Sequence, residues 1–196
     1  MPLFILLVCY FWRKNMKYYL VALLDEGSSA EVIDIQKFLS KKYKLFKNIS
    51  NLYIPLGSVS NVDLEKLDEV VTKIISPYKK FKVGIDNGFG LSDDLNMVNL
   101  KVEDKGYINR ISRNLFDTLN LHGFTVKDFN TDTFNIPLSN ANHNIRKAYS
   151  NNNLSIDNSK SKEDFLKFAK ISKIEIWKQM NSKKDSVVKT YNLKDY

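Results

Sequence analysis

The sequence is poor in cysteine, histidine, glycine and proline, and each shortage excludes a class of protein. Cys9 is the single cysteine, so an internal disulfide is excluded and a reducing cytoplasm is the expected location. The two histidines and one cysteine form no zinc-ligand spacing, so we expect neither a metal nor a cofactor. Seven Gly and four Pro among 196 residues are too few for a linker-rich or disordered chain. The composition therefore indicates a compact folded protein.

Long apolar runs are also missing, with one short exception at the N-terminus. Residues 2–12 are almost wholly apolar, which is about half of what a bilayer span needs. Positive charge follows this run instead of preceding it, unlike in a signal peptide, and Met16 then opens a strand-like segment. We therefore expect residues 1–15 to be an extension outside the fold, with residues 16–196 forming the folded domain. The alternative is a short membrane-seeking anchor.

Positive charge is abundant: the net charge is +8 and the pI about 9.3, and lysine carries most of it. Such a surface favours polyanions, although a Lys- and Asn-rich composition is also what an A+T-rich genome produces. Residues 41–47 interleave lysines with Tyr43 and Phe46, as surfaces that bind single-stranded nucleic acid do. We favour the simpler interpretation that this segment is a helix end with buried aromatics and solvated lysines.

Hydrophobic periodicity predicts a sheet protein of the α+β or mixed α/β class. Predicted strands cover residues 17–24, 51–58, 81–85, 97–102, 133–138, 171–178 and 186–193. Predicted helices cover residues 30–43, a segment from the N-cap Asp63 to just before Pro77, 107–121, and 163–169. The Asn- and Ser-rich residues 140–162 are predicted to be a long loop, and residues 181–184 a hairpin turn.

One pentapeptide pattern occurs twice. Residues 52–56 read Leu-Tyr-Ile-Pro-Leu and residues 134–138 read Phe-Asn-Ile-Pro-Leu. Strand alternation places Tyr53 with Pro55 on one face and Ile54 with Leu56 on the other, and the second copy follows the same rule. Because proline lacks the amide that a central ladder needs, each copy predicts an edge, a bulge or a locally splayed strand. Coincidence between two short strands is the alternative.

With these flanking residues the chain resembles the two-histidine phosphoesterases, which include the bacterial 2′-5′ RNA ligase-like proteins and cyclic phosphodiesterases. In that family each half carries His-x-Thr or His-x-Ser in an apolar strand. Residues 17–23, the two pentapeptides and the closing segment 174–178 match the family order, so the resemblance covers residues 16–196. It implies two pseudo-symmetric lobes with antiparallel sheets around a central cleft and helices outside.

The diagnostic residues are absent from both halves. The resemblance maps the two histidines, which act as general base and acid, onto Tyr53 and Asn135. It maps the phosphate-holding hydroxyls onto Pro55 and Pro137. Asparagine moves no proton, tyrosine with a pKa near 10 is a poor base at neutrality, and proline has no donor. His143, a few residues past the second copy, is the weak catalytic candidate.

The resemblance and the missing histidines together lead to three functional hypotheses. The first is a catalytically inactive member of the fold that binds RNA ends, cyclic nucleotides or other phosphodiesters through Tyr53 and Asn135, with Arg110 and Arg113 as further phosphate ligands. The second is an active phosphoesterase or RNA ligase-like hydrolase that uses non-standard residues. The third is a protein-interaction module. Enzymatic activity is therefore left open, and no membrane partner is expected.

Overall fold

The computed structural model describes residues 17–60, 62–103, 106–127, 133–150, 166–178 and 186–195. Residues 1–15, expected to be an extension, and the predicted turn at residues 181–184 lie outside these ranges. The described elements are β1 (Lys17–Leu24), α2 (Glu26–Tyr43), β2 (Tyr53–Ser60), α3 (Leu64–Ile75), β3 (Phe81–Leu91), β4 (Met97–Val102), α4 (Tyr107–Leu121), β5 (Thr125–Lys127), β6 (Phe134–Asn140), α5 (His143–Ser150), β7 (Phe168–Lys178) and β8 (Ser186–Asn192).

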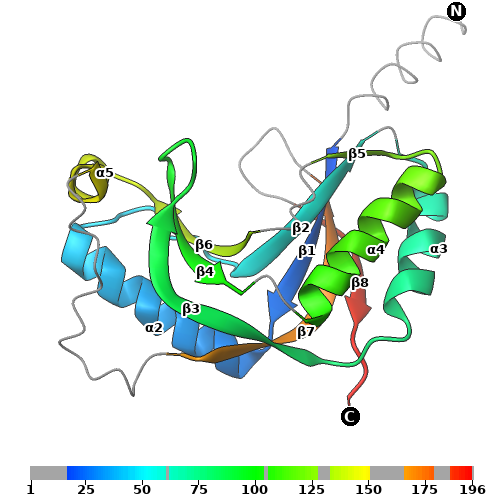
Figure 1. Cartoon of the computed structure of the whole chain (residues 1–196), viewed down its shortest axis with the longest axis horizontal. Coiled ribbons are helices and arrows are strands. Elements are labelled where there is room, and N and C mark those ends of the chain that lie inside the picture. The colour runs from blue at the N-terminus through cyan, green and yellow to red at the C-terminus, as the bar shows by residue number, and fades with distance from the viewer. Residues whose placement is uncertain are drawn as a thin grey trace, which may run out of the picture.

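The strands form one strongly bent sheet in the order β5-β2-β1-β7-β3-β4-β6, with β8 added on β7. All named strand pairs are antiparallel, and the long β7 connects the two halves by pairing with β1 and β8 and also with β3. Helices α3 and α4 lie at one end of the molecule and α2 and α5 at the other (Figure 1). The predicted α+β class with two lobes is confirmed.

The core lies between the helices and one face of the sheet. Alternate residues of β1 and β2 are buried, and helix α3 contributes an apolar face that ends just before Pro77. The predicted N-cap of α3 is confirmed, because Oδ1 of Asp63 accepts hydrogen bonds from the amides of Glu65 and Lys66 at 3.0 and 3.4 Å. The predicted bounds of β1, β4 and α4 agree with the structure.

Three sequence predictions were wrong. The predicted loop at residues 140–162 contains α5, which Asn142 caps by accepting from the amide of Ile145 at 3.1 Å. The predicted helix at residues 163–169 is wrong for its described part, since Phe168 and Ala169 belong to β7 and pair with β3. The first helix begins at Glu26, a turn earlier than predicted, because Asp25 caps it through the Ser28 amide at 2.9 Å. The short edge strand β5 was not predicted.

Candidate functional site

The two pentapeptide copies have the same local structure. Ile54 and Leu56 on β2 are fully buried while Tyr53 is half-buried and Pro55 exposed. On β6, Ile136 and Leu138 are buried and Asn135 is half-buried, so these three positions follow the predicted alternation as well. The two prolines differ, because Pro137 is buried.

Each proline sits at a bulge, as its missing amide led us to predict. In the first copy the register jumps from Leu20↔Gly57 to Val21↔Pro55, which leaves Leu56 as the extra residue. In the second copy it jumps from Val98↔Ser139 to Asn99↔Pro137, which leaves Leu138 as the extra residue. The sequence repeat is therefore a repeat of backbone geometry: each proline is followed by a bulged leucine in both halves of the sheet.

The chain segment that leads into β2 is attached to β6. The amide of Ile49 donates to the carbonyl of Leu138 at 2.9 Å, and Asn48 forms an antiparallel bridge with Ser139. Gln36 on α2 is buried and donates its side-chain amide to the carbonyls of both Ile49 and Leu138, at 2.9 and 2.6 Å. These contacts bring together β2 and β6, which stand far apart in the strand order (Figure 1). We call Tyr53, Pro55, Asn135 and Pro137 the motif residues.

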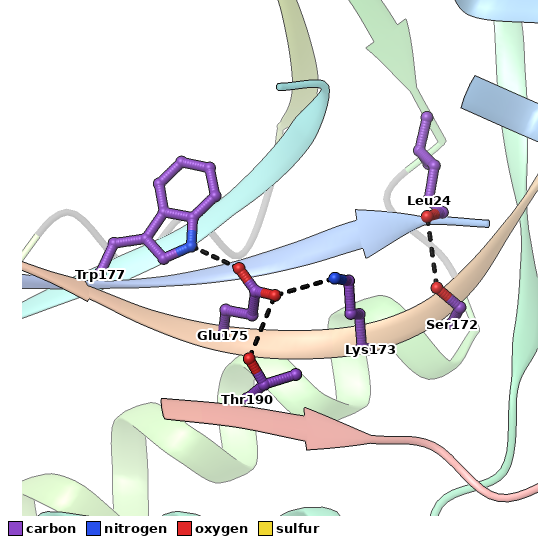
Figure 2. A network of polar contacts seen from close by, with 6 residues as sticks. All are labelled: Leu24, Ser172, Lys173, Glu175, Trp177 and Thr190. Carbon is purple, nitrogen blue, oxygen red and sulfur yellow. Dashed lines mark hydrogen bonds and ion pairs between the residues drawn. The ribbon is translucent and has the colours of Figure 1, made fainter. Parts of the chain in front are cut away.

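Tyr53 packs against an aromatic and acidic network on β7. Its ring meets the ring of Trp177 edge-on, with 4.8 Å between the centroids. Trp177 Nε1 donates to Oε2 of the buried Glu175 at 2.7 Å. Glu175 Oε1 also accepts from Lys173 Nζ at 3.0 Å and from Thr190 Oγ1 on β8 at 3.2 Å (Figure 2). The carboxylate is therefore well compensated, which a buried charge requires.

Sequence reasoning missed Glu175. Residues 174–177 read Ile-Glu-Ile-Trp, and a carboxylate placed on the same strand face as an indole in an apolar strand was the available signal. The segment was noticed only for its resemblance to the family's closing strand.

A lysine lies beside Asn135. Lys101 on β4 is the register partner of Asn135 and is exposed. Its side chain extends over β3, since a methyl group at Gly90 would lie 3.5 Å from Lys101 Cε. The alternation of β4 indicated that Lys101 shares a face with Asn99, but no sequence signal indicated that this face adjoins the second motif copy. Lys101 provides a positive charge next to Asn135.

A pocket of about 620 Å³ lies where β1 ends and α2 begins. Leu23, which pairs with Tyr53, lines it together with Asp25, Asn51, Lys80 and Lys173. Burial raises the pKa of Asp25, but hydrogen bonds from Ser28 and the charges of Lys170 and Lys80 outweigh this effect and hold the pKa below its usual value. Because Lys173 also binds Glu175, a line of contacts connects this pocket to Tyr53.

The other predicted site residues lie elsewhere. His143 is the exposed first residue of α5. It follows the C-terminal end of β6, whereas Asn135 lies near the N-terminal end of that strand. Arg110 and Arg113 are on the exposed side of α4. His122 is at the C-cap of α4, and its carbonyl accepts from Lys66 Nζ at 2.9 Å.

Neither a metal centre nor a membrane span was found in the part of the chain that the structure describes. It contains no group of three or more His, Cys, Asp or Glu side chains that could hold a metal ion. It also contains no helix long and apolar enough to cross a membrane.

Known structures match the chain along nearly its whole length, although no protein-family model and no curated protein matches its sequence. The ligand-free structure of LigT from E. coli is 11% identical, has a TM-score of 0.58, and covers 92% of this chain and 98% of its own. A phosphoesterase structure is 10% identical with a TM-score of 0.57, and the match covers 92% of this chain and 99% of the phosphoesterase chain. Usb1 from Kluyveromyces marxianus is 12% identical with a TM-score of 0.53, and the match covers 93% of this chain and 100% of the Usb1 chain.

The chain has the two-histidine phosphoesterase fold. The resemblance drawn from the order of the motifs is therefore confirmed at the level of fold. Within the two-histidine phosphoesterase fold, this chain has Tyr53, Pro55, Asn135 and Pro137 in its two pentapeptide strands.

Proposed function

We propose that this chain binds RNA ends, nucleotides or other phosphodiesters over the motif residues and does not catalyse the two-proton reaction of the two-histidine phosphoesterases. The proposal rests on one observation: the two halves keep matching bulged strands while both carry side chains unsuited to proton transfer. The same bulged backbone at both copies, with Tyr53 and Asn135 half-buried in equivalent positions, favours a binding role.

The side chains near the motif residues suit an anionic ligand. Lys101 provides a cation beside Asn135, whose amide can donate to a phosphate oxygen or to the edge of a base. Tyr53 offers a hydroxyl and a ring face that Trp177 holds in place. Neither proline can replace the two hydroxyls, so phosphate binding would rely on Lys101 and Asn135.

The ligands of related structures support this class of ligand. LigT from E. coli has been crystallised with NADP+, ATP, 3'-AMP and phosphate, and Usb1 from Kluyveromyces marxianus with uridine monophosphate. A nucleotide or phosphodiester ligand carries both the negative charge and the planar ring that the side chains around Tyr53 and Asn135 would recognise. The expected cytoplasmic location stays a prediction.

Calorimetric titration with 3'-AMP and with a 2′,3′-cyclic nucleotide tests the binding. We expect Lys101→Met and Tyr53→Ala each to weaken binding by about tenfold, the value of one charge-assisted hydrogen bond or one stacked ring. Arg113→Met is the matched control, because it removes an exposed cation from α4. Equal losses of affinity in Lys101→Met and Arg113→Met would indicate that the ligand binds near α4. No binding at all would favour a protein-interaction module.

Turnover separates the binding hypothesis from the enzyme hypothesis. We expect no hydrolysis of 2′,3′-cyclic nucleotides or 2′-5′-linked oligonucleotides above the rate in buffer. Hydrolysis that disappears in His143→Ala would contradict the proposal and identify an enzyme with non-standard residues.

A further inference from the structure

A lysine-rich loop after α2 exposes a phenylalanine almost completely. The Phe46 side chain is 89% exposed, whereas the neighbouring Leu45 is buried and Tyr43 is half-buried against Phe89, with 6.0 Å between the ring centroids. The simpler sequence interpretation, in which the aromatics of this segment are buried, is therefore wrong for Phe46. Exposure of a whole aromatic side chain forgoes about 1.5–3 kcal/mol of burial energy, so its position needs an explanation.

Strong anchoring on both sides shows that Phe46 is not exposed by a loose loop. On one side Asn142 Nδ2 donates to the carbonyls of Tyr43 and Lys44 at 2.8 and 2.9 Å. On the other side the carbonyl of Lys47 accepts from the Asn140 amide and from Ser139 Oγ, both at 3.0 Å. The ring is therefore presented to solvent from a fixed backbone.

The backbone at Lys44 is strained. Its φ is 55°, the left-handed conformation that glycine usually provides after a helix, and Lys44 caps α2 in this conformation. A lysine at this position lowers stability relative to glycine. The presence of lysine instead of glycine at this strained position is explained if the positive charge of its side chain binds a ligand.

Four exposed lysines lie within five residues of Phe46 in the sequence. Lys41, Lys42, Lys44 and Lys47 are all exposed, and none forms an ion pair within the described ranges of the chain. Phe38, 45% exposed, precedes Lys41 and Lys42 by three and four residues on α2, so the three share one side of the helix. We call Phe38, Lys41, Lys42, Lys44, Phe46 and Lys47 the Lys-Phe surface.

We propose that the Lys-Phe surface binds single-stranded nucleic acid, with a base stacked on Phe46 and phosphates bound by Lys44 and Lys47. Sequence-tolerant single-strand surfaces combine exposed aromatic rings with exposed cations. A protein partner fits less well, because the cores of protein interfaces are depleted of lysine. The inference does not rest on the proposed function of the motif residues, since this surface can bind a strand by itself.

The position of the surface allows one strand to reach both sites. Asn48, two residues after Phe46, pairs with Ser139 on β6, and Asn135 lies four residues before Ser139 in that strand. At about 3.3 Å per residue, this separation along β6 is about 13 Å. A strand whose end lies over Asn135 could therefore continue toward Phe46.

Fluorescence anisotropy with a labelled oligouridylate of about 12 nucleotides, blocked at both ends, tests the inference. We expect Phe46→Leu to weaken binding by about tenfold and Phe46→Trp to preserve it, because stacking needs a ring and not merely an apolar group. Leu121→Ala is the matched control, since Leu121 is 86% exposed on the distant helix α4 and should change nothing.

Lysine variants test the charge without harming the fold. We expect Lys44→Gly to weaken binding and to reduce the slope of log affinity against log salt by about 0.7, the value of one phosphate contact on a single strand. Because glycine relieves the strain at this position, its urea midpoint should stay the same or rise. Weakening with unchanged stability attributes the loss to the missing charge.

Several outcomes would overturn the inference: no binding at about 50 mM salt, stronger binding of a duplex of the same length, or full affinity in Phe46→Leu. The last result would show that the strand binds without a base stacked on Phe46. The blocked oligonucleotide also separates this inference from the proposed function. Tyr53→Ala should weaken 3'-AMP binding and spare the blocked strand, whereas Phe46→Leu should do the reverse.

Discussion

Replacing Glu175 by alanine is predicted to lower the free energy of unfolding by about 2–4 kcal/mol, because the carboxylate is 4% exposed and has three partners. The largest part comes from Trp177, whose buried Nε1–H would lose its acceptor, at a cost of about 1–3 kcal/mol. Lys173 is 38% exposed and can turn to water, so its ion pair adds at most about 1 kcal/mol. Thr190 is exposed and adds little.

Urea denaturation followed by far-ultraviolet circular dichroism measures this loss. Glu175→Gln is the control, because it keeps an oxygen acceptor for Trp177 and gives up the ion pair with Lys173 and the hydrogen bond from the exposed Thr190, so we expect it to cost about 1 kcal/mol. For a chain of this size the alanine variant should melt roughly 5–15 °C lower. A loss below about 0.5 kcal/mol, the range of ordinary surface substitutions, would refute the reasoning, as would equal losses in the two variants.

The same substitution connects stability to ligand binding. Trp177 supports the ring of Tyr53, and Glu175→Ala should loosen the indole of Trp177. We therefore expect Glu175→Ala to bind 3'-AMP more weakly than Glu175→Gln does. Calorimetric titration at a temperature where both variants are folded measures this difference. Equal affinities would mean that Tyr53 is held by other contacts.

Three further substitutions test other parts of the structure. The Lys189 ammonium and the Tyr191 hydroxyl hold the pKa of Asp68 below its usual value, so its contribution is present above about pH 4 and is lost as the pH falls further. Asp68→Asn should therefore cost about 0.5 kcal/mol near neutrality, since the pair is exposed to water, and nothing in acid. The free energy of unfolding of the unaltered protein and of Asp68→Asn, measured as the pH is lowered, tests this. A difference in stability that stays constant at every pH would contradict it. Gln36→Leu should destabilise by about 1–3 kcal/mol in urea, because the carbonyl of Ile49 loses this donor and the carbonyl of Leu138 keeps only the amide of Ile49. A neutral result would mean that β2 and β6 hold together without Gln36. Lys44→Gly should stabilise by about 0.5–1 kcal/mol, and a loss of stability would show that its left-handed backbone is not strained.

The sequence predicted much of the fold because local signals agreed with the tertiary structure. Asp63 caps α3 where its position before an apolar run indicated, and each motif proline marked its bulge through the missing amide. The α5 segment was missed because its composition is typical of loops. Its helix depends on Asn142, which also binds the end of α2, a contact that sequence reasoning does not reveal.

The candidate site was only partly predictable, for similar reasons. Tyr53 and Asn135 followed from the repeat and the resemblance, but Lys101 and Glu175 matter through partners on other strands. Strand pairing also determined the secondary structure of Phe168, which was predicted to be helical but lies in β7 and pairs with Gly84 on β3. The exposure of Phe46 results from contacts on both sides of the loop, whereas its apolar character favoured burial.

We propose that the chain has the two-histidine phosphoesterase fold and binds phosphodiesters but does not hydrolyse them. A phosphorus NMR spectrum of a 2′,3′-cyclic nucleotide mixed with the protein tests binding and conversion in one sample. The account predicts a broadened or shifted cyclic phosphate signal that persists. It also predicts conversion to a phosphomonoester signal when Tyr53→His, Pro55→Thr, Asn135→His and Pro137→Thr are combined. A phosphomonoester signal that grows in proportion to the unaltered protein would contradict it.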